Sequence, residues 1–326
     1  MKEHEIRPQA IFDEYLRLTE IDTITFFGDA PRTELPCPAC KCTGIQAFVK
    51  SGFTYTECQE CFTLYVSPRP VRSAFERYYT DSPSTRFWAT TFYKETETAR
   101  REKIWKPRAE LIKSKVARFS NIVEIVDVGG GYGTFAEEVR RISDYQVRII
   151  EPSKHLAEVC RRKGFPVIGK FLEKMVKSDL GEGQRCFVSF ELFEHLYDPV
   201  EFLHCLNDLM HTGDLFIFTT LNGVGVDIQV LWEHSKAVSP PHHLNFFNPL
   251  SVRMLLESCG FEPMEITTPG KLDINIIENN IQHVTDRFWR TFFRISSVTD
   301  KRDLQEYVSS HLFSSHMMVV CRKRRV

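Results

Sequence analysis

The segment Ile125–Glu137, with the sequence IVDVGGGYGTFAE, constrains the fold of this chain more than any other. It begins with Ile125–Val128, whose β-branched density is typical of a buried parallel strand. Glycines follow, and the residues after them predict the start of a helix. A strand, a glycine turn and a helix bring the backbone close to a ligand, because glycine has no Cβ to hold the ligand away.

The spacing of these glycines separates two kinds of nucleotide site. Gly129, Gly131 and Gly133 form the pattern G-x-G-x-G. A dinucleotide fingerprint would need glycine or alanine at the next position, where Thr134 stands. A glycine turn alone is a weak signal, so its meaning depends on the residues that follow.

Strands and helices alternate along the rest of the chain. Alternation of this kind predicts an α/β fold with a doubly wound parallel sheet, in which ligands bind at the carboxyl ends of the strands. The predicted strands after the first are Gln146–Ile150, Pro166–Gly169, Cys186–Phe190, Asp214–Thr220, Phe261–Thr268 and Met317–Cys321. The predicted helices are Lys154–Lys163, Pro199–Met210 and Pro249–Cys259.

Two C-x-x-C pairs precede this region. Cys37 and Cys40 form the first pair, and Cys58 and Cys61 form the second, with 17 residues between the pairs. This is a zinc-ribbon spacing, and four thiolates would close the tetrahedral shell of a structural Zn²⁺. We expect a ribbon over residues 35–70, after an N-terminal extension at 1–34. The alternative is four unrelated buried cysteines; Cys42 is not an expected ligand.

Residues 71–120 are predicted to be helical and are rich in aromatic side chains. The predicted helices are Val71–Tyr79, Thr85–Lys103 and Pro107–Phe119. An aromatic stripe at helical spacing is usually core, although it could also form a lid over a ligand pocket.

Composition limits the partners. The 326 residues include 42 Lys and Arg against 43 Asp and Glu, so the net charge of −1 favours neither nucleic acid nor an anionic membrane. No apolar stretch approaches membrane-spanning length, and the first residues have no apolar signal region. We therefore expect a cytoplasmic protein with reduced cysteines.

Glu151 makes the glycine turn more informative. It ends the second predicted strand, about 20 residues beyond the glycines, where an acid accepts hydrogen bonds from ribose hydroxyls. NAD sites and S-adenosylmethionine sites share this device. Three features favour an S-adenosylmethionine site. They are the glycine pattern, a fourth strand that runs into FELFEHLYDP (Phe190–Pro199), and the continuation of the sheet to a sixth and a final strand.

Together these features resemble class I S-adenosylmethionine-dependent methyltransferases from about Val123 onward. The cysteine pairs, Ser67–Pro70 (SPRP) and Pro240–Phe247 (PPHHLNFF) resemble a bacterial subgroup with an N-terminal zinc-binding module. Its members act in sugar, surface-polysaccharide or secondary-metabolite pathways. The resemblance implies methyl transfer of the EC 2.1.1 type to a small-molecule acceptor such as a sugar or nucleotide-sugar. The methyltransferase domain would span 121–326, with an insertion at about 270–307.

The resemblance also implies roles for individual residues around the cofactor. Glu191, like Glu194, could instead be a solvated loop acid. The residues implied are Asp127, Gly129, Gly131 and Gly133 at the methionine part, Glu151 at the ribose, Pro152, Phe171 and Leu172 at the adenine, and Glu191 at the sulfonium end.

Two histidines follow the fifth predicted strand. A histidine near its ordinary pKa suits the role of a base, and we expect His243, or else His242, to act as base or to contact the acceptor. Both could instead be hydrogen-bonded in a loop ordered by prolines.

Other functions remain open at this point. The chain could be an NAD-linked oxidoreductase, a non-catalytic scaffold whose ribbon binds a protein or nucleic acid, or a methyltransferase with a macromolecular acceptor. The acceptor atom and the oligomeric state are not identified, and the insertion could shape the acceptor site or form a dimer contact.

Overall fold

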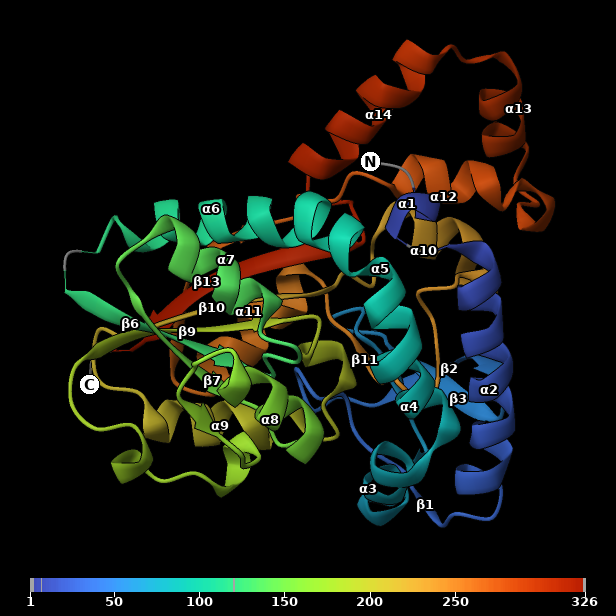
Figure 1. Ribbon diagram of the computed structural model, residues 1–326. Coiled ribbons are helices and arrows are strands. Elements are labelled where there is room, and N and C mark those ends of the chain that lie inside the picture. Colours follow the sequence, from blue (N-terminus) through green and yellow to red (C-terminus); the bar gives the residue numbers. More distant parts are fainter. Residues whose placement is uncertain (1–2, 7, 120, 325–326) are drawn as a thin grey trace. The chain divides into compact units, whose positions relative to one another are not determined.

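The computed structural model describes residues 3–6, 8–119 and 121–324 and divides into two compact units (Figure 1). The chain passes back and forth between them, so each unit contains segments that are far apart in the sequence. The first unit consists of Met1–Thr98, Leu221–Val252 and Thr267–Met317, and the second of Ala99–Thr220, Arg253–Ile266 and Met318–Val326.

A seven-stranded sheet organises the second unit. The pairs β10–β9, β9–β6, β6–β7 and β7–β8 are parallel, which confirms the predicted α/β class. The first strand, β6, lies between β7 and β9, so the strand order reverses beside it. From edge to edge the strands are β12 (Phe261–Thr267), β13 (His316–Lys323), β10 (Leu215–Leu221), β9 (Gln184–Phe190), β6 (Ile122–Val128), β7 (Gln146–Ile150) and β8 (Val167–Ile168).

Helices pack on both faces of this sheet. Leu215 and Ile217 of β10 point into a core that also contains residues of α6 (Lys106–Val116), α7 (Thr134–Ile142) and α8 (Lys154–Arg162). The intervening Phe216 points to the other face, because side chains alternate along a strand. There its ring lies 6.4 Å from that of Phe202 in α9 (Pro199–Leu209). Figure 1 shows α6 and α7 above the sheet and α9 below it. Helix α11 spans Pro249–Ser258, and the short helices η3, η4 and η5 span Leu172–Lys174, Lys177–Asp179 and Phe193–His195.

A four-stranded sheet belongs to the first unit. Its strands are β2 (Gly44–Lys50), β3 (Phe53–Cys58), β4 (Leu64–Val66) and β11 (Asn245–Phe246), in the order β11-β4-β3-β2. The first two follow the first cysteine pair, and β3 ends at Cys58 of the second pair. The fourth comes from the distant PPHHLNFF segment, whose pairing with β4 the sequence did not predict.

Arg69 joins these two segments. It is only 2% exposed and donates to the side chain of Asn245 at 2.8 Å and to the carbonyl of Leu244 at 3.3 Å. Arg69 lies in β5 (Arg69–Pro70), which pairs with β1 (Arg32–Thr33). The SPRP and PPHHLNFF segments therefore form one structural element.

The predicted break between helices at Thr85–Lys103 and Pro107–Phe119 is wrong. The helical conformation continues from Pro83 to Val116 and includes two π-helical turns, the second directly before α6. Pro107 has no N–H to donate, and it lies just after the π-helical turn η2, where the regular i to i−4 hydrogen bonds are already interrupted, so it does not end the run. The segments before α6 are α4 (Pro83–Phe87), η1 (Trp88–Phe92), α5 (Tyr93–Arg100) and η2 (Arg101–Trp105).

The insertion predicted at about 270–307 forms several separate helices. Asp286 accepts a hydrogen bond from the amide of Trp289 at 3.2 Å, so a new helix begins there. The segments of the insertion are α12 (Asp273–Asn279), η7 (Ile281–His283), α13 (Arg287–Ile295) and α14 (Val298–Ser310). The other helices of this unit are α1 (Glu3–Ile6), α2 (Gln9–Phe27), α3 (Arg72–Asp81), α10 (Val226–Leu231) and η6 (Trp232–His234). Among the helices described, none is both long and apolar enough to cross a membrane.

Two buried carboxyl groups join α10 to α12. Asp227 is 1% exposed and is hydrogen-bonded to Asp273, which is 2% exposed. Asp273 also accepts bonds from the Ser314 hydroxyl, the Ser315 amide and the Gln305 side chain, each at 2.7 Å. Burial, together with the charge of Asp273, raises the pKa of Asp227 to about 8.

Asp227→Asn should flatten the pH dependence of stability. The folded protein retains a proton that an unfolded aspartate, with a pKa near about 3.9, releases. The contribution of this proton to the free energy of unfolding is therefore full below about pH 4 and is lost as the pH rises to about 8. Between pH 5 and 8 the free energy of unfolding of the wild type should fall by roughly 1 kcal/mol per pH unit relative to that of the variant. In the variant, the side-chain amide of the new Asn still donates to Asp273 but does not titrate.

Urea unfolding at several pH values measures this effect. Asp300→Asn is the control, because Asp300 is an exposed residue in the first turn of α14 that accepts from Ser297. It should lower stability without changing the slope between pH 5 and 8. Equal slopes for Asp227→Asn and the wild type would show that the two carboxyl groups do not share a proton.

Candidate functional site

In the turn between β6 and α7, every second residue lies in the left-handed backbone region. The φ angles of Gly129, Gly131 and Gly133 are 75°, 55° and 70°, which explains the G-x-G-x-G spacing. A Cβ on Gly133 would lie 3.1 Å from the Cys160 sulfur, whereas one on Gly131 would meet no described atom within 4 Å. Gly133 therefore permits close packing against α8, and Gly131 borders open space.

Glu151 is bound to this turn. It follows β7 and is 6% exposed. One carboxylate oxygen accepts from the Gly131 amide and the other from the Ser153 amide, each at 2.9 Å. Burial raises the pKa of Glu151, and the two amides oppose that shift. Each oxygen keeps a lone pair for a further donor, such as a hydroxyl group.

Asp127, near the end of β6, offers a second buried carboxyl group. It is 2% exposed, and its Oδ2 has no hydrogen-bond partner within residues 3–6, 8–119 and 121–324. Burial, with the charge of Glu151 as the next cause, raises the pKa of Asp127 to about 7, while Arg108 lowers it. A ligand that brings hydrogen-bond donors and positive charge would satisfy this oxygen.

The carboxyl ends of β9 and β10 carry two more acids. Glu191 follows β9 and accepts from the Thr219 hydroxyl at 2.9 Å and from Arg108 at 3.2 Å. Glu194 is 1% exposed and accepts from the Thr220 hydroxyl at 3.0 Å. Burial, with the charge of Glu191 as the next cause, raises the pKa of Glu194 to about 8. Its interpretation as a solvated loop acid is therefore wrong.

Two predicted adenine contacts follow β8, at the short helix η3 (Leu172–Lys174). Phe171 is 54% exposed and Leu172 is buried. With Pro152, which follows Glu151, they complete the predicted cofactor residues. All of these lie in or just after β6, β7, β8 and β9, the adjacent parallel strands of the second unit.

The two candidate histidines lie in the first unit. The Nε2 atom of His242 is 2.6 Å from the Tyr78 hydroxyl, and burial lowers the pKa of His242 to about 3. It is therefore neutral at physiological pH and is a poor base. His243 is half-buried, and its Nδ1 forms a hydrogen bond with the carbonyl of Ala237. This bond orients the ring of His243.

The four predicted zinc ligands lie together. The Cys37 and Cys61 sulfurs are 3.4 Å apart, the Cys40 and Cys58 sulfurs are 3.3 Å apart, and all four lie within 4.8 Å of one another. In a tetrahedral zinc thiolate site, with Zn–S bonds of about 2.3 Å, the sulfurs are about 3.8 Å apart. A metal ion therefore fits among these thiols with small adjustments.

The two cysteine pairs occupy equivalent turns. The amide of Lys41 donates to the Cys37 carbonyl at 2.9 Å, and the amide of Phe62 donates to the Cys58 carbonyl at 3.0 Å. Lys41 and Phe62 both have positive φ, at 65° and 56°. In addition, the Asn248 side chain donates to the Cys61 carbonyl at 2.7 Å. The second turn is thus tied to the segment that follows PPHHLNFF, a contact with no sequence signal.

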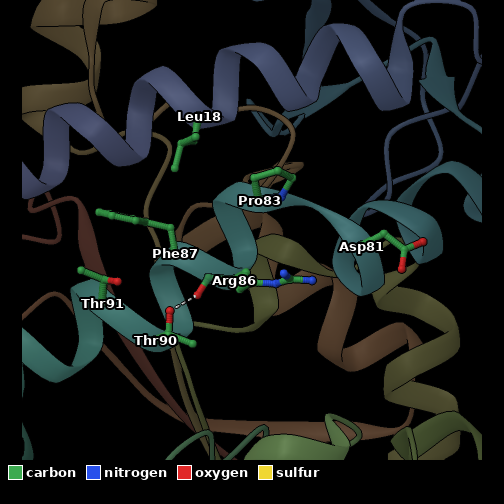
Figure 2. A pocket seen from close by; sticks show the side chains of 7 residues that line it. All are labelled: Leu18, Asp81, Pro83, Arg86, Phe87, Thr90 and Thr91. Carbon is green, nitrogen blue, oxygen red and sulfur yellow. Dashed lines mark hydrogen bonds between the residues drawn. The ribbon is translucent and has the colours of Figure 1, made fainter.

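A shallow hollow lies on the helices of the first unit (Figure 2). The only hydrogen bond drawn there runs from the Thr90 hydroxyl to the Arg86 carbonyl at 2.9 Å, within one helical turn. The hollow therefore has no evident catalytic arrangement. It is lined by Leu18, Asp81, Pro83, Arg86, Phe87, Thr90 and Thr91.

Residues 97–266 match the family model of the methyltransferase domain. The chain belongs to the methyltransferase-domain family. The match covers the glycine turn, Glu151 and all the strands from β6 to β10, and it ends within β12. It does not include the four-cysteine cluster.

Solved structures support the methyltransferase fold. A chain in the complex between the Haloferax volcanii Trm112 methyltransferase activator and the putative methyltransferase is 14% identical, with coverage of 73% of this chain and 96% of that one and a TM-score of 0.50. The plantazolicin methyltransferase BpumL, in complex with a monoazolic desmethylPZN analog and SAH, is 12% identical, with coverage of 77% of this chain and 94% of that one and a TM-score of 0.50. No curated protein matches the chain.

Gly133→Ala should destabilise the methyltransferase domain more than Gly131→Ala. Both variants place a Cβ in the left-handed region, at a cost of about 1–2 kcal/mol. Only Gly133→Ala crowds the Cys160 sulfur and the Ile149 side chain, at 3.1 and 3.3 Å, which adds about 1–3 kcal/mol. Thermal or urea unfolding without ligand compares the two. Equal losses would contradict the separate roles of these glycines.

Proposed function

We propose that this chain is an S-adenosylmethionine-dependent methyltransferase that acts on a small-molecule acceptor. One observation carries the proposal: in a methyltransferase-domain chain, the Gly131 backbone borders open space while the adjacent Glu151 and Asp127 keep acceptor capacity. Buried acceptors next to open space are suited to a ligand that brings its own donors.

The residues present fit this cofactor. Glu151 would accept from the ribose hydroxyls through the lone pairs that the two amides leave. Asp127 would accept from the ammonium group of the methionine part, which also supplies the positive charge that a buried carboxylate requires. Pro152, Phe171 and Leu172 would contact the adenine.

The chemistry requires little of the protein beyond placement. The cofactor supplies a methyl group made electrophilic by its sulfonium. The protein must hold the acceptor in line and, where the nucleophile carries a proton, remove it. Glu191 would face the sulfonium end. We assign the base to His243 rather than His242, because the low pKa of His242 makes it a weak proton acceptor.

The acceptor class rests on two further arguments. The combination of cysteine pairs, SPRP and PPHHLNFF resembles methyltransferases of sugar, polysaccharide and secondary-metabolite pathways. The fold neighbour BpumL acts, by its name, on plantazolicin. The first favours a sugar, a nucleotide-sugar or a related metabolite, and the second is consistent with a natural-product acceptor.

We further propose that the four-cysteine cluster binds one structural Zn²⁺. Cys37, Cys40, Cys58 and Cys61 would occupy all four positions, so this ion would have no open site for catalysis. Its role would be to hold the two equivalent turns together, since β2, β3, β4 and β11 form too small a sheet for a large core of its own.

Calorimetric titration with S-adenosylhomocysteine tests the cofactor assignment, with NADH as the comparison ligand. The wild type should bind the first and not the second. Glu151→Gln should weaken binding by about tenfold or more, because a neutral amide replaces a charged acceptor. His243→Ala, in the other unit, should leave affinity unchanged and lower methyl transfer to an acceptor found by screening nucleotide-sugars.

The alternative functions give different results. Binding of NADH alone would identify an oxidoreductase. Binding of neither ligand, with the zinc content intact, would favour a non-catalytic scaffold.

Metal analysis of purified protein tests the zinc site. We expect about one zinc per chain, lost in Cys58→Ser together with more than about 2 kcal/mol of stability. Cys42→Ser is the matched control, because the Cys42 sulfur lies 3.7 Å from the Cys40 carbonyl and outside the four-sulfur cluster. Undiminished zinc in Cys58→Ser would overturn the assignment.

A further inference from the structure

We propose that the C-terminal end of α8 is a positioning device for the cofactor site, in which Cys160 and Lys163 hold the glycine turn in its binding conformation. The inference rests on the proposed function, because it concerns the same turn. Neither residue carries a signal in the sequence motif, and neither is expected to touch the cofactor.

The Gly131 peptide groups are held from both sides. The Gly131 amide donates to Glu151 at 2.9 Å, and the Cys160 thiol donates to the Gly131 carbonyl at 3.2 Å. Cys160 is completely buried, and its sulfur would also be the nearest contact of a Cβ on Gly133. One side chain therefore fills the space under the turn and fixes a carbonyl direction within it.

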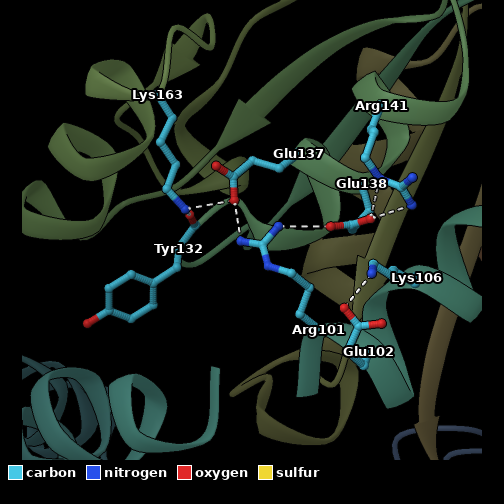
Figure 3. A network of polar contacts seen from close by, with 8 residues as sticks. All are labelled: Arg101, Glu102, Lys106, Tyr132, Glu137, Glu138, Arg141 and Lys163. Atoms are coloured by element: carbon cyan, nitrogen blue, oxygen red, sulfur yellow. Dashed lines mark hydrogen bonds and ion pairs between the residues drawn. The ribbon is translucent and has the colours of Figure 1, made fainter. Parts of the chain in front are cut away.

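Lys163 holds the next carbonyl. Its ammonium group donates to the Tyr132 carbonyl at 2.9 Å. The same group forms an ion pair with Glu137 in the first turn of α7 at 3.0 Å. Figure 3 shows this lysine between the Tyr132 backbone and the Glu137 carboxylate. Two consecutive carbonyls of the glycine turn are thus bound by side chains from α8 and from the residue that follows it.

Arg101 completes the network. From η2 it pairs with Glu137 at 2.7 Å and with Glu138 at 2.9 Å (Figure 3). Glu137 forms ion pairs with both Arg101 and Lys163. Its carboxylate is therefore held in the position that anchors the lysine. The side chains of Arg101, Glu137 and Lys163 are each about one quarter exposed, so this ion-pair network is only partly screened by water.

The consequence for binding is pre-organisation. A trans peptide directs its C=O and the following N–H in opposite directions, so fixing the Gly131 carbonyl toward Cys160 directs the Tyr132 amide away from α8. Glycine-rich turns have unusually large conformational freedom. A turn that is already ordered spares the ligand the entropy of ordering it, and affinity rises accordingly.

The test combines hydrogen exchange of the ligand-free protein with calorimetric titration of S-adenosylhomocysteine. Lys163→Met keeps the length of the side chain and removes the donor, whereas Lys163→Arg keeps a cationic donor. We expect Lys163→Met to speed amide exchange in the 129–134 segment and to weaken ligand binding by about tenfold. Lys163→Arg should restore most of the protection from exchange and most of the ligand affinity. Cys160→Ala should have the same effects as Lys163→Met. Cys160→Ser should restore part of the exchange protection and of the affinity.

Arg162→Met is the matched control, because Arg162 lies beside Lys163 and pairs at 3.7 Å with the exposed Glu158. It should change neither measurement. If the wild type binds and Lys163→Met binds equally well, with unchanged exchange, the positioning role is wrong. If Lys163→Met lowers global stability together with affinity, and Lys163→Arg rescues neither, the role is merely structural. Failure of the wild type itself to bind would overturn the proposed function instead.

Discussion

The hydrogen bond between the Gly131 amide and the Glu151 carboxylate joins the ends of the first two strands of the central sheet. Parallel strands β6 and β7 lie side by side, so the residues that follow them meet at one edge. The alternating positive φ angles of the turn allow the backbone to approach Glu151 and leave Gly131 beside open space. The position of every other predicted cofactor residue follows from this edge, because each lies in or just after one of four neighbouring strands.

The same edge concentrates buried acids. Asp127, Glu151 and Glu194 are each less than about one tenth exposed, and burial raises the pKa of all three. Three buried carboxyl groups in one domain oppose folding unless protons, donors or a cationic ligand compensate them. Amides and hydroxyls partly compensate Glu151 and Glu194, whereas one oxygen of Asp127 has no protein partner in the part of the chain described. This imbalance is the strongest physical indication of a ligand in the structure.

The first unit is built differently. Its small sheet takes three strands from the region of the cysteine pairs and a fourth from Asn245–Phe246, with the buried Arg69 joining them. The Asn248 side chain connects the second cysteine turn to the same distant segment. Metal binding, if confirmed, would therefore stabilise contacts between parts of the chain about 200 residues apart, and not only a local ribbon.

Local patterns in the sequence determined the α/β class, the strand positions, the glycine turn, Glu151 and the four cysteines that meet in space. These features depend on side-chain periodicity and fixed spacing, which are local properties. Only the tertiary structure showed that Glu194 is buried, that PPHHLNFF supplies a strand beside the ribbon, and that Cys160 and Lys163 hold the glycine turn. It also showed helices continuing past Pro107 and ending before Asp286. Burial and long-range hydrogen bonds depend on which distant segments pack together, and no window of sequence contains that information.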